Sequence, residues 1–170
     1  GAADGQHVPA GWRRIWGASQ WTDGAGGVML AAKASAERYI GARGGDATGV
    51  SKIEGWGHRT ATMSFAEKME ESATAPYVLP HTRRAIMDAF KRADIEDVWA
   101  VDVIETHDCF TTSEYMAIDH FGLTDPGESW KAIEDGTIDF GGRLPINPSG
   151  GLHGAGPPGG PPPTPPPPGT

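Results

Sequence analysis

The amino-acid sequence predicts an α/β domain in which helices alternate with buried strands. Apolar residues recur at helical spacing across residues 81–93, and charged residues occupy the opposite face. The run DVWAVDVIET at residues 97–106 follows directly. A near-continuous apolar run of this kind is typical of a strand that is covered on both faces of an α/β sheet. A helix leading into a buried strand is half of a βαβ unit.

Weaker patterns precede this unit. Residues 28–30 (VML) are expected to form a short buried strand, and residues 31–40 are rich in helix formers up to Gly41, which suits a helix C-cap. Residues 50–63 are bounded by glycines and alternate loosely between apolar and polar side chains, which favours a strand. Residues 64–80 have a mixed composition and two prolines, so we expect a loop with one helical turn.

Two helices are predicted after the buried strand. Apolar side chains share one helical face across residues 110–121, with a threonine or serine among residues 111–113 as N-cap and Gly122 as the stop. Residues 129–135 form a short helix that ends at Gly136. The start of the first of these helices lies at the carboxyl end of a strand, where open α/β sheets usually bind their ligands.

Composition and charge narrow the classes of function. The chain has 170 residues, which suits one domain, and its formal net charge is −8, whereas a nucleic-acid surface needs a concentrated basic face. The densest basic stretch, within residues 83–92, is expected to be a solvated helix face, with a local phosphate contact as the alternative. The single cysteine excludes an internal disulfide and a four-cysteine zinc site. No apolar run approaches the ~20 residues that span a bilayer, and no signal-peptide layout opens the chain, so we expect a soluble cytoplasmic protein without a membrane partner.

Cys109 is the first candidate for chemistry, because it stands where the predicted strand gives way to a helix. A thiol near a helix N-terminus lies at the positive end of the helix dipole, and a protonated His107 would favour the thiolate further. A lone cysteine is also a common small residue of a buried core, and a lone histidine is often a hydrogen-bonded structural residue. From these residues alone, both interpretations stay open.

Three motifs in order resemble the thiolase superfamily, and specifically its sterol-carrier-protein-type members. They are TDGAGGVMLA at residues 22–31, HDCF at residues 107–110 and INPSGG at residues 146–151. The resemblance covers residues 19–152 and concerns the C-terminal part of that family. It implies a thiolase-like α/β fold, in which two βαβαβ halves pack as a layered αβαβα architecture. This chain would hold mainly the C-terminal βαβαβ half, in incomplete form.

The resemblance also implies domain boundaries. Residues 1–48 would be the end of the N-terminal half and a linker, and residues 49–155 would be the C-terminal half. Residues 156–170 form a proline- and glycine-rich tail that we expect to be disordered or polyproline II, because proline removes backbone donors and locks φ.

In that family coenzyme A esters are substrates and no further cofactor is implied. A cysteine of the first half becomes acylated, while a second cysteine exchanges a proton at the α-carbon. By resemblance His107 helps to form the oxyanion hole for the enolate, and Cys109 is that second cysteine. The resemblance further assigns substrate binding to the NPSGG loop, whose glycines let the backbone approach the acyl thioester. A plain glycine-proline turn is the alternative for that loop. The loop residues concerned are Asn147, Ser149, Gly150 and Gly151.

The chain departs from the family pattern in two places. Thiolases carry a GHP motif whose histidine deprotonates the nucleophilic cysteine, but Pro157 stands at that position here, and His153 lies four residues earlier. Nothing before Trp21 resembles a half that carries a nucleophilic cysteine. We therefore expect an incomplete acyltransferase, inactive alone, that forms a homodimer or a hetero-oligomer with a chain supplying the N-terminal half. The alternative is a noncatalytic scaffold that binds acyl-CoA or a partner chain.

Overall fold

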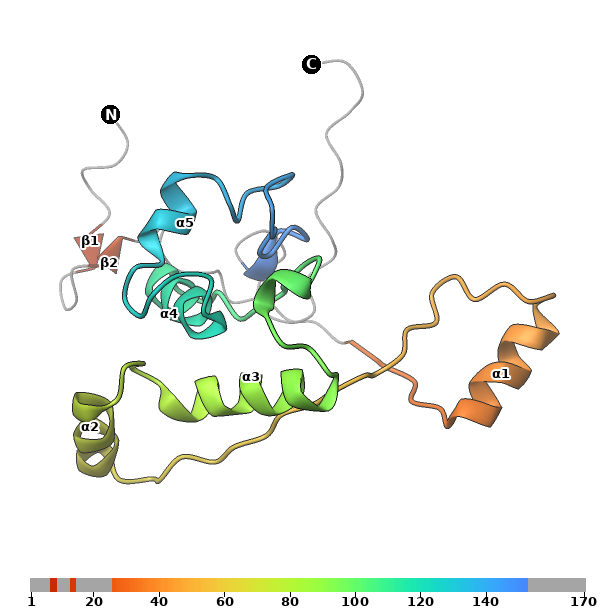
Figure 1. Cartoon of the computed structure of the whole chain (residues 1–170), viewed down its shortest axis with the longest axis horizontal. Helices are drawn as coiled ribbons and strands as arrows, with labels where there is room; N and C mark the ends of the chain where they lie inside the picture. The colour runs from red at the N-terminus through yellow and green to blue at the C-terminus, as the bar shows by residue number, and fades with distance from the viewer. Residues whose placement is uncertain (1–6, 9–12, 15–25, 153–170) are drawn as a thin grey trace, which may run out of the picture.

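The computed structural model describes residues 7–8, 13–14 and 26–152, and helices make up most of the regular structure in this part of the chain (Figure 1). The elements are β1 His7–Val8, β2 Arg13–Arg14, α1 Lys33–Ala42, α2 Phe65–Thr74, α3 Pro80–Arg92, the 3-10 helix η2 Val98–Ala100, α4 Thr111–Phe121 and α5 Trp130–Glu134. Within the described ranges no helix combines the length and apolar content needed to cross a bilayer. The tail expected to be disordered, His153 and Pro157 lie outside these ranges.

The helices predicted from periodicity form close to their expected bounds. Pro80 opens α3 at a position where its missing N–H is not needed, and two cations in the last turn suit the negative end of the helix dipole. Gly122 ends α4 with a φ of 77°, a left-handed conformation that favours glycine. α1 and α5 also form close to their predicted ranges, but the expected C-cap at Gly41 is wrong, because α1 continues to Ala42 and its C-cap is Arg43. The expected side-chain cap of α4 is wrong, because its N-cap is Phe110 and no side chain caps it.

The expected loop at residues 64–80 is also wrong, because ten of these residues form helix α2. Ser64 is its N-cap and its hydroxyl accepts the N–H of Glu67 at 3.3 Å. A serine followed three residues later by a glutamate is the sequence pattern of a capping box. Both prolines, Pro76 and Pro80, lie beyond the end of α2 and so do not interrupt it.

The strands expected at residues 28–30, 50–63 and 97–106 do not form. Val28 is 88 % exposed rather than buried, and residues 97–106 contain η2 followed by one isolated parallel bridge between Ile104 and Ile146. A strand is defined by hydrogen bonds to a neighbour, and within the described residues only the bridge at Ile104 supplies them for these three segments. The βαβαβ arrangement is therefore absent from the described ranges.

A small apolar core surrounds α4 and supports the loops that flank it. Ile118 of α4, Ala132 of α5 and the returning residues Leu144 and Ile146 are buried together. The remaining members come from the segments before and after α4, and they are Val98, Ile104 and Leu123. Ile104 and Ile146 therefore belong to both the parallel bridge and the core.

The extended segment that precedes α2 runs alongside α3 (Figure 1). Gly57 lies so close to Ala85 that an added Cβ would overlap the Ala85 carbonyl oxygen and lie 2.6 Å from its carbon. Gly55 makes the same kind of contact one helical turn further on, against the Ala89 carbonyl. The guanidinium of Arg92 lies 4.8 Å from the centre of the Trp56 ring, a cation–π contact between α3 and the same segment.

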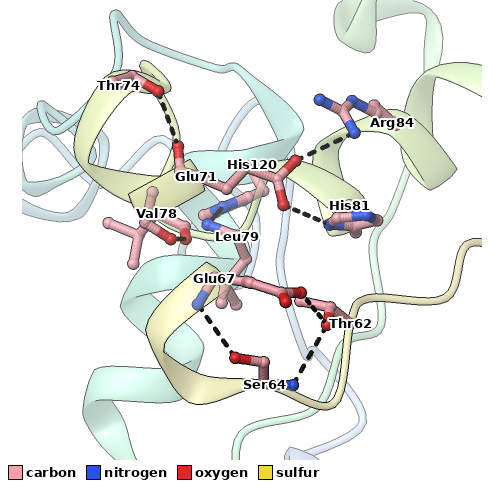
Figure 2. A network of polar contacts seen from close by, with 11 residues as sticks. Thr62, Ser64, Glu67, Glu71, Thr74, Val78, Leu79, His81, Arg84 and His120 are labelled. Carbon is pink, nitrogen blue, oxygen red and sulfur yellow. Dashed lines mark hydrogen bonds and ion pairs between the residues drawn. The ribbon is translucent and has the colours of Figure 1, made fainter. Parts of the chain in front are cut away.

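Polar contacts join α2, α3 and α4 (Figure 2). Glu71 of α2 pairs with Arg84 at 3.2 Å and lies 3.4 Å from His81 Nδ1, both on α3. The fully buried His120 of α4 accepts the Leu79 N–H at Nε2, at 2.8 Å. Arg83 donates to the carbonyls of His120 and Phe121, at 2.8 and 2.9 Å, and so satisfies the last turn of α4. These contacts fix α3 against the helix that follows Cys109.

Substitution Gly57→Ala tests the contact between residues 50–63 and α3. We expect about 1–3 kcal/mol of destabilisation, because the methyl group has no space against Ala85. Urea unfolding followed by tryptophan fluorescence is the measurement, since Trp56 stands next to the substitution. Gly41→Ala is the matched control, because nothing lies within 4 Å of Gly41. Equal midpoints for the two variants would contradict the contact.

Candidate functional site

One parallel bridge brings the two motif loops together. The Ile104 N–H donates to the Pro145 carbonyl at 3.0 Å, and the Asn147 N–H donates to the Ile104 carbonyl at 2.8 Å. Because the bridged segments are parallel, the residues that follow them leave at the same edge. The loop with His107 and Cys109 therefore lies beside the NPSGG loop at residues 147–151.

Asn147 joins the two loops through its side chain. Its Oδ1 accepts the Thr106 N–H at 2.7 Å, and its Nδ2 donates to Glu114 of α4 at 3.1 Å. Its backbone has a φ of 53°, a left-handed conformation that asparagine tolerates better than most residues. Both polar ends of the Asn147 amide are therefore engaged within the protein.

Ser149 is exposed and bonded to Glu105. Its N–H donates to Glu105 Oε1 at 3.0 Å, and its hydroxyl donates to Glu105 Oε2 at 2.7 Å. Glu105 is the residue that follows Ile104 of the bridge. This carboxylate therefore accepts two hydrogen bonds from the turn that follows Asn147.

Gly150 and Gly151 complete the turn in conformations that favour glycine, with φ values of 99° and 56°. The next N–H, that of Leu152, donates to Asp108 Oδ1 at 2.6 Å. The Asp108 carboxylate is almost fully buried, with 2 % of the residue exposed. The second loop is thus bonded to the first at both of its ends.

His107 and Cys109, by contrast, are both accessible to solvent, His107 more than Cys109. His107 is exposed and makes no hydrogen bond or ion pair within the described ranges. Cys109 is half-buried, and its thiol lies 3.8 Å from the Ser113 hydroxyl on the first turn of α4. An imidazole that can donate or accept a proton therefore flanks a partly accessible thiol in one loop.

Sequence reasoning missed three carboxylates of this region, Glu105, Asp108 and Glu114. Each accepts hydrogen bonds from one part of residues 147–152. Two of them stand within or next to the HDCF motif, and the carboxyl ends of parallel strands meet at one edge of a sheet. The contacts themselves join residues 33 or 44 positions apart, so no local pattern in the sequence specifies them. The first turns of α4, which follow Cys109 in the chain, carry an open depression on their surface. It is lined by Thr111, Thr112, Tyr115 and Met116.

Substitution Asn147→Ala tests the bond between the loops. It removes both amide bonds and places alanine in a left-handed conformation, so we expect a loss of about 1–3 kcal/mol in unfolding free energy. Asn147→Gly removes the same bonds but relieves the backbone, so its loss is expected to be smaller. Ser149→Ala removes a single exposed hydroxyl bond, the one to Glu105, and is expected to cost less than Asn147→Ala. Chemical denaturation measures all three, and a stability of Asn147→Ala at or above that of Asn147→Gly would contradict this account.

Comparison with known proteins identifies the family to which this chain belongs. A family model described as "Thiolase C-terminal domain-like" matches residues 64–162, which is more than half of the chain. The match begins at the cap of α2 and covers both motif loops.

Curated relatives agree with the family model. The chain is 39 % identical over 77 residues to an acetyl-CoA acetyltransferase of Methanothermobacter thermautotrophicus, covering 45 % of this chain and 20 % of the relative. It is 40 % identical over 77 residues to sterol carrier protein 2 of Gallus gallus, covering 45 % and 14 %. An acetyl-CoA acetyltransferase of Methanocaldococcus jannaschii is 37 % identical over 98 residues, covering 56 % and 24 %.

The matched region spans less than a quarter of the length of each of these relatives. The range matched by the family model contains both motifs, HDCF at residues 107–110 and INPSGG at residues 146–151. The chain belongs to the thiolase superfamily, as a part of its C-terminal domain.

Proposed function

We propose that this chain contributes the C-terminal share of a thiolase-type acyltransferase site that acts on acyl-CoA. The observation that carries the proposal is the pairing of the two motif loops by the Ile104–Ile146 bridge, which leaves His107 exposed and Cys109 partly accessible beside residues 147–151. The names of two relatives, both acetyl-CoA acetyltransferases, support the same class of reaction. Coenzyme A enters this scheme as part of the substrate.

Cys109 is the proposed acid and base at the α-carbon of the acyl group. Its thiolate takes the α-proton and forms an S–H bond, while the electron pair of the broken C–H bond moves into an enolate. The negative charge develops on the thioester oxygen, and the His107 ring N–H donates a hydrogen bond to that oxygen. The reverse step returns the proton from sulfur to carbon.

The NPSGG loop is the proposed wall on which the thioester lies. Gly150 and Gly151 add no side chains of their own to this wall, while Asn147 and Ser149 hold the loop through bonds to Thr106, Glu114 and Glu105. In this scheme Asn147 and Ser149 support binding through the loop, and the glycine backbone meets the substrate.

The remaining steps of acyl transfer need groups from outside this sequence. The single cysteine of the chain is assigned to proton transfer, so a second cysteine must carry the acyl group. We propose that a chain with the N-terminal half supplies it, in a homodimer or a hetero-oligomer. We further propose that this assembly forms in the cytoplasm.

A carrier role is the second candidate, because several relatives are named sterol carrier protein 2 and the polar groups of Asn147 and Ser149 are already bonded inside the protein. In that case the chain would bind acyl-CoA or a partner chain without proton transfer. The two candidates differ in whether Cys109 exchanges a proton with carbon.

Exchange of the α-protons of acetyl-CoA in deuterated water separates the two candidates, because it needs an acid and base but no acylated cysteine. We expect slow exchange with the intact chain, followed by proton NMR of the acetyl group. Cys109→Ala is expected to lower the rate at least tenfold by removing the base, as is His107→Ala by removing the oxyanion donor.

Asp102→Asn is the matched control, since Asp102 is exposed, lies on the same segment and makes no hydrogen bond or ion pair within the described residues. Exchange that continues unchanged in Cys109→Ala would refute the proton-transfer role. Binding of acetyl-CoA by calorimetry together with no exchange would favour the carrier role.

Complete thiolysis is expected to be undetectable for this chain alone. Acetoacetyl-CoA and free coenzyme A would be assayed by loss of the enolate absorbance, with and without a purified N-terminal half of a thiolase. Proline at position 157 offers no proton acceptor to activate a nucleophile, and loss of one member of a catalytic unit typically costs orders of magnitude in rate. Turnover by the chain alone that depends on Cys109 would contradict this expectation.

A further inference from the structure

Asp108 stands between the two residues proposed for chemistry, yet its side chain turns into the protein. Only 2 % of the residue is exposed, and its Oδ1 accepts the Leu152 N–H at 2.6 Å. A carboxylate is costly to bury unless polar groups satisfy it, so an acid buried at this position is expected to have a structural or functional role. His107 before it is exposed and Cys109 after it is half-buried.

Gly151 explains what the carboxylate does there. A Cβ at position 151 would overlap Asp108 Oδ2 and lie 2.7 Å from Asp108 Cγ and 3.0 Å from Oδ1. The carboxyl group therefore occupies the volume that any side chain at position 151 would need. The second glycine of the NPSGG loop is thus required by a contact inside the protein, in addition to its φ of 56°.

We propose that Asp108 is a positioning residue, which seats the Gly151–Leu152 backbone against the loop of His107 and Cys109 and so sets the gap between the two loops. This inference rests on the proposed function, because the gap matters only if acyl-CoA enters it. One carboxylate oxygen holds the Leu152 N–H and the other packs on Gly151, so the carboxylate fixes both the distance and the direction of approach.

The anchored side chain also fixes the two neighbours of Asp108. Rotation of the backbone at residue 108 would disturb the bond to Leu152 and the contact with Gly151. His107 and Cys109 project from that same backbone, so their separation from the glycine turn follows from the position of one carboxylate. Glu105 and Glu114 hold the other end of the loop, through Ser149 and Asn147.

A double-mutant cycle between Asp108 and Gly151 tests the contact. We expect Gly151→Ala to lower the urea midpoint strongly in the native chain, where the methyl group meets the carboxylate. The same substitution is expected to cause a much smaller shift in the background of Asp108→Ala, because the carboxylate is gone. The strain of alanine at a φ of 56° is present in both backgrounds and cancels in the cycle.

Asp108→Asn is the matched variant that keeps the volume and an acceptor oxygen but removes the charge. In that background Gly151→Ala is expected to shift the midpoint as much as in the native chain. If Asp108→Ala does not fold, Asp108→Ser removes most of the same volume and completes the cycle. Midpoint shifts that simply add in every background would overturn the proposal.

Alkylation of Cys109 by iodoacetamide, under conditions in which every variant is folded, gives a readout that stability alone does not move. Asp108→Ala is expected to raise the labelling rate at least fivefold by releasing the loop, whereas Asp108→Asn and the exposed control Asp102→Asn stay within twofold of the native chain. Equal labelling rates for Asp108→Ala and the native chain would overturn the positioning role.

Neither measurement contains acyl-CoA, so its outcome does not depend on the acyl-transfer proposal. A cycle that shows coupling together with an absence of α-proton exchange would leave Asp108 as the residue that sets the gap and remove only the catalytic use of that gap. Additive midpoint shifts together with normal α-proton exchange would overturn the positioning role of Asp108 and leave the acyl-transfer proposal in place.

Discussion

The two hydrogen bonds of the parallel bridge between Ile104 and Ile146 hold the rest of the site in place. They pair the segment before His107 with the segment before the NPSGG loop, and both side chains of the bridge, Ile104 and Ile146, are buried in the core. Burial excludes water from the backbone groups, so these bonds have no competing solvent partner. Every other contact between the loops depends on the register that this bridge sets, because a shift by one residue would turn Ile146 out of the core.

Carboxylates then attach the second loop to the first. Glu105 and Asp108 come from the first loop and Glu114 from the first turn of α4, and each binds a different part of residues 147–152. The N–H groups of Ser149 and Leu152 donate to Glu105 and Asp108 rather than to a backbone carbonyl within the described residues. The acidic side chains supply these acceptors, while His107 stays exposed and Cys109 half-buried in the same loop.

The helices beneath the site are fixed by contacts of a different kind. Arg83 of α3 satisfies two carbonyls at the end of α4, and the buried His120 accepts the N–H of Leu79 at the start of α3. Ile118, in the same part of α4, lies in the core with Leu144. The helix that follows Cys109 and carries Glu114 in its first turn is therefore bonded to α3 at its last turn.

By itself, the sequence determined α1, α3, α4 and α5, and it identified both motif loops with His107 and Cys109. These features depend on neighbours a few residues apart, such as Pro80 at the start of α3 and Gly122 after α4. Helix α2 was also encoded locally, by Ser64 and Glu67, although that signal was overlooked. Only the tertiary structure decided that the apolar segments at residues 28–30 and 50–63 stay outside a sheet, because a strand requires hydrogen bonds from another segment. It alone decided the partners of Glu105 and Asp108 as well, since each binds a residue 44 positions away and no local pattern specifies contacts over that distance.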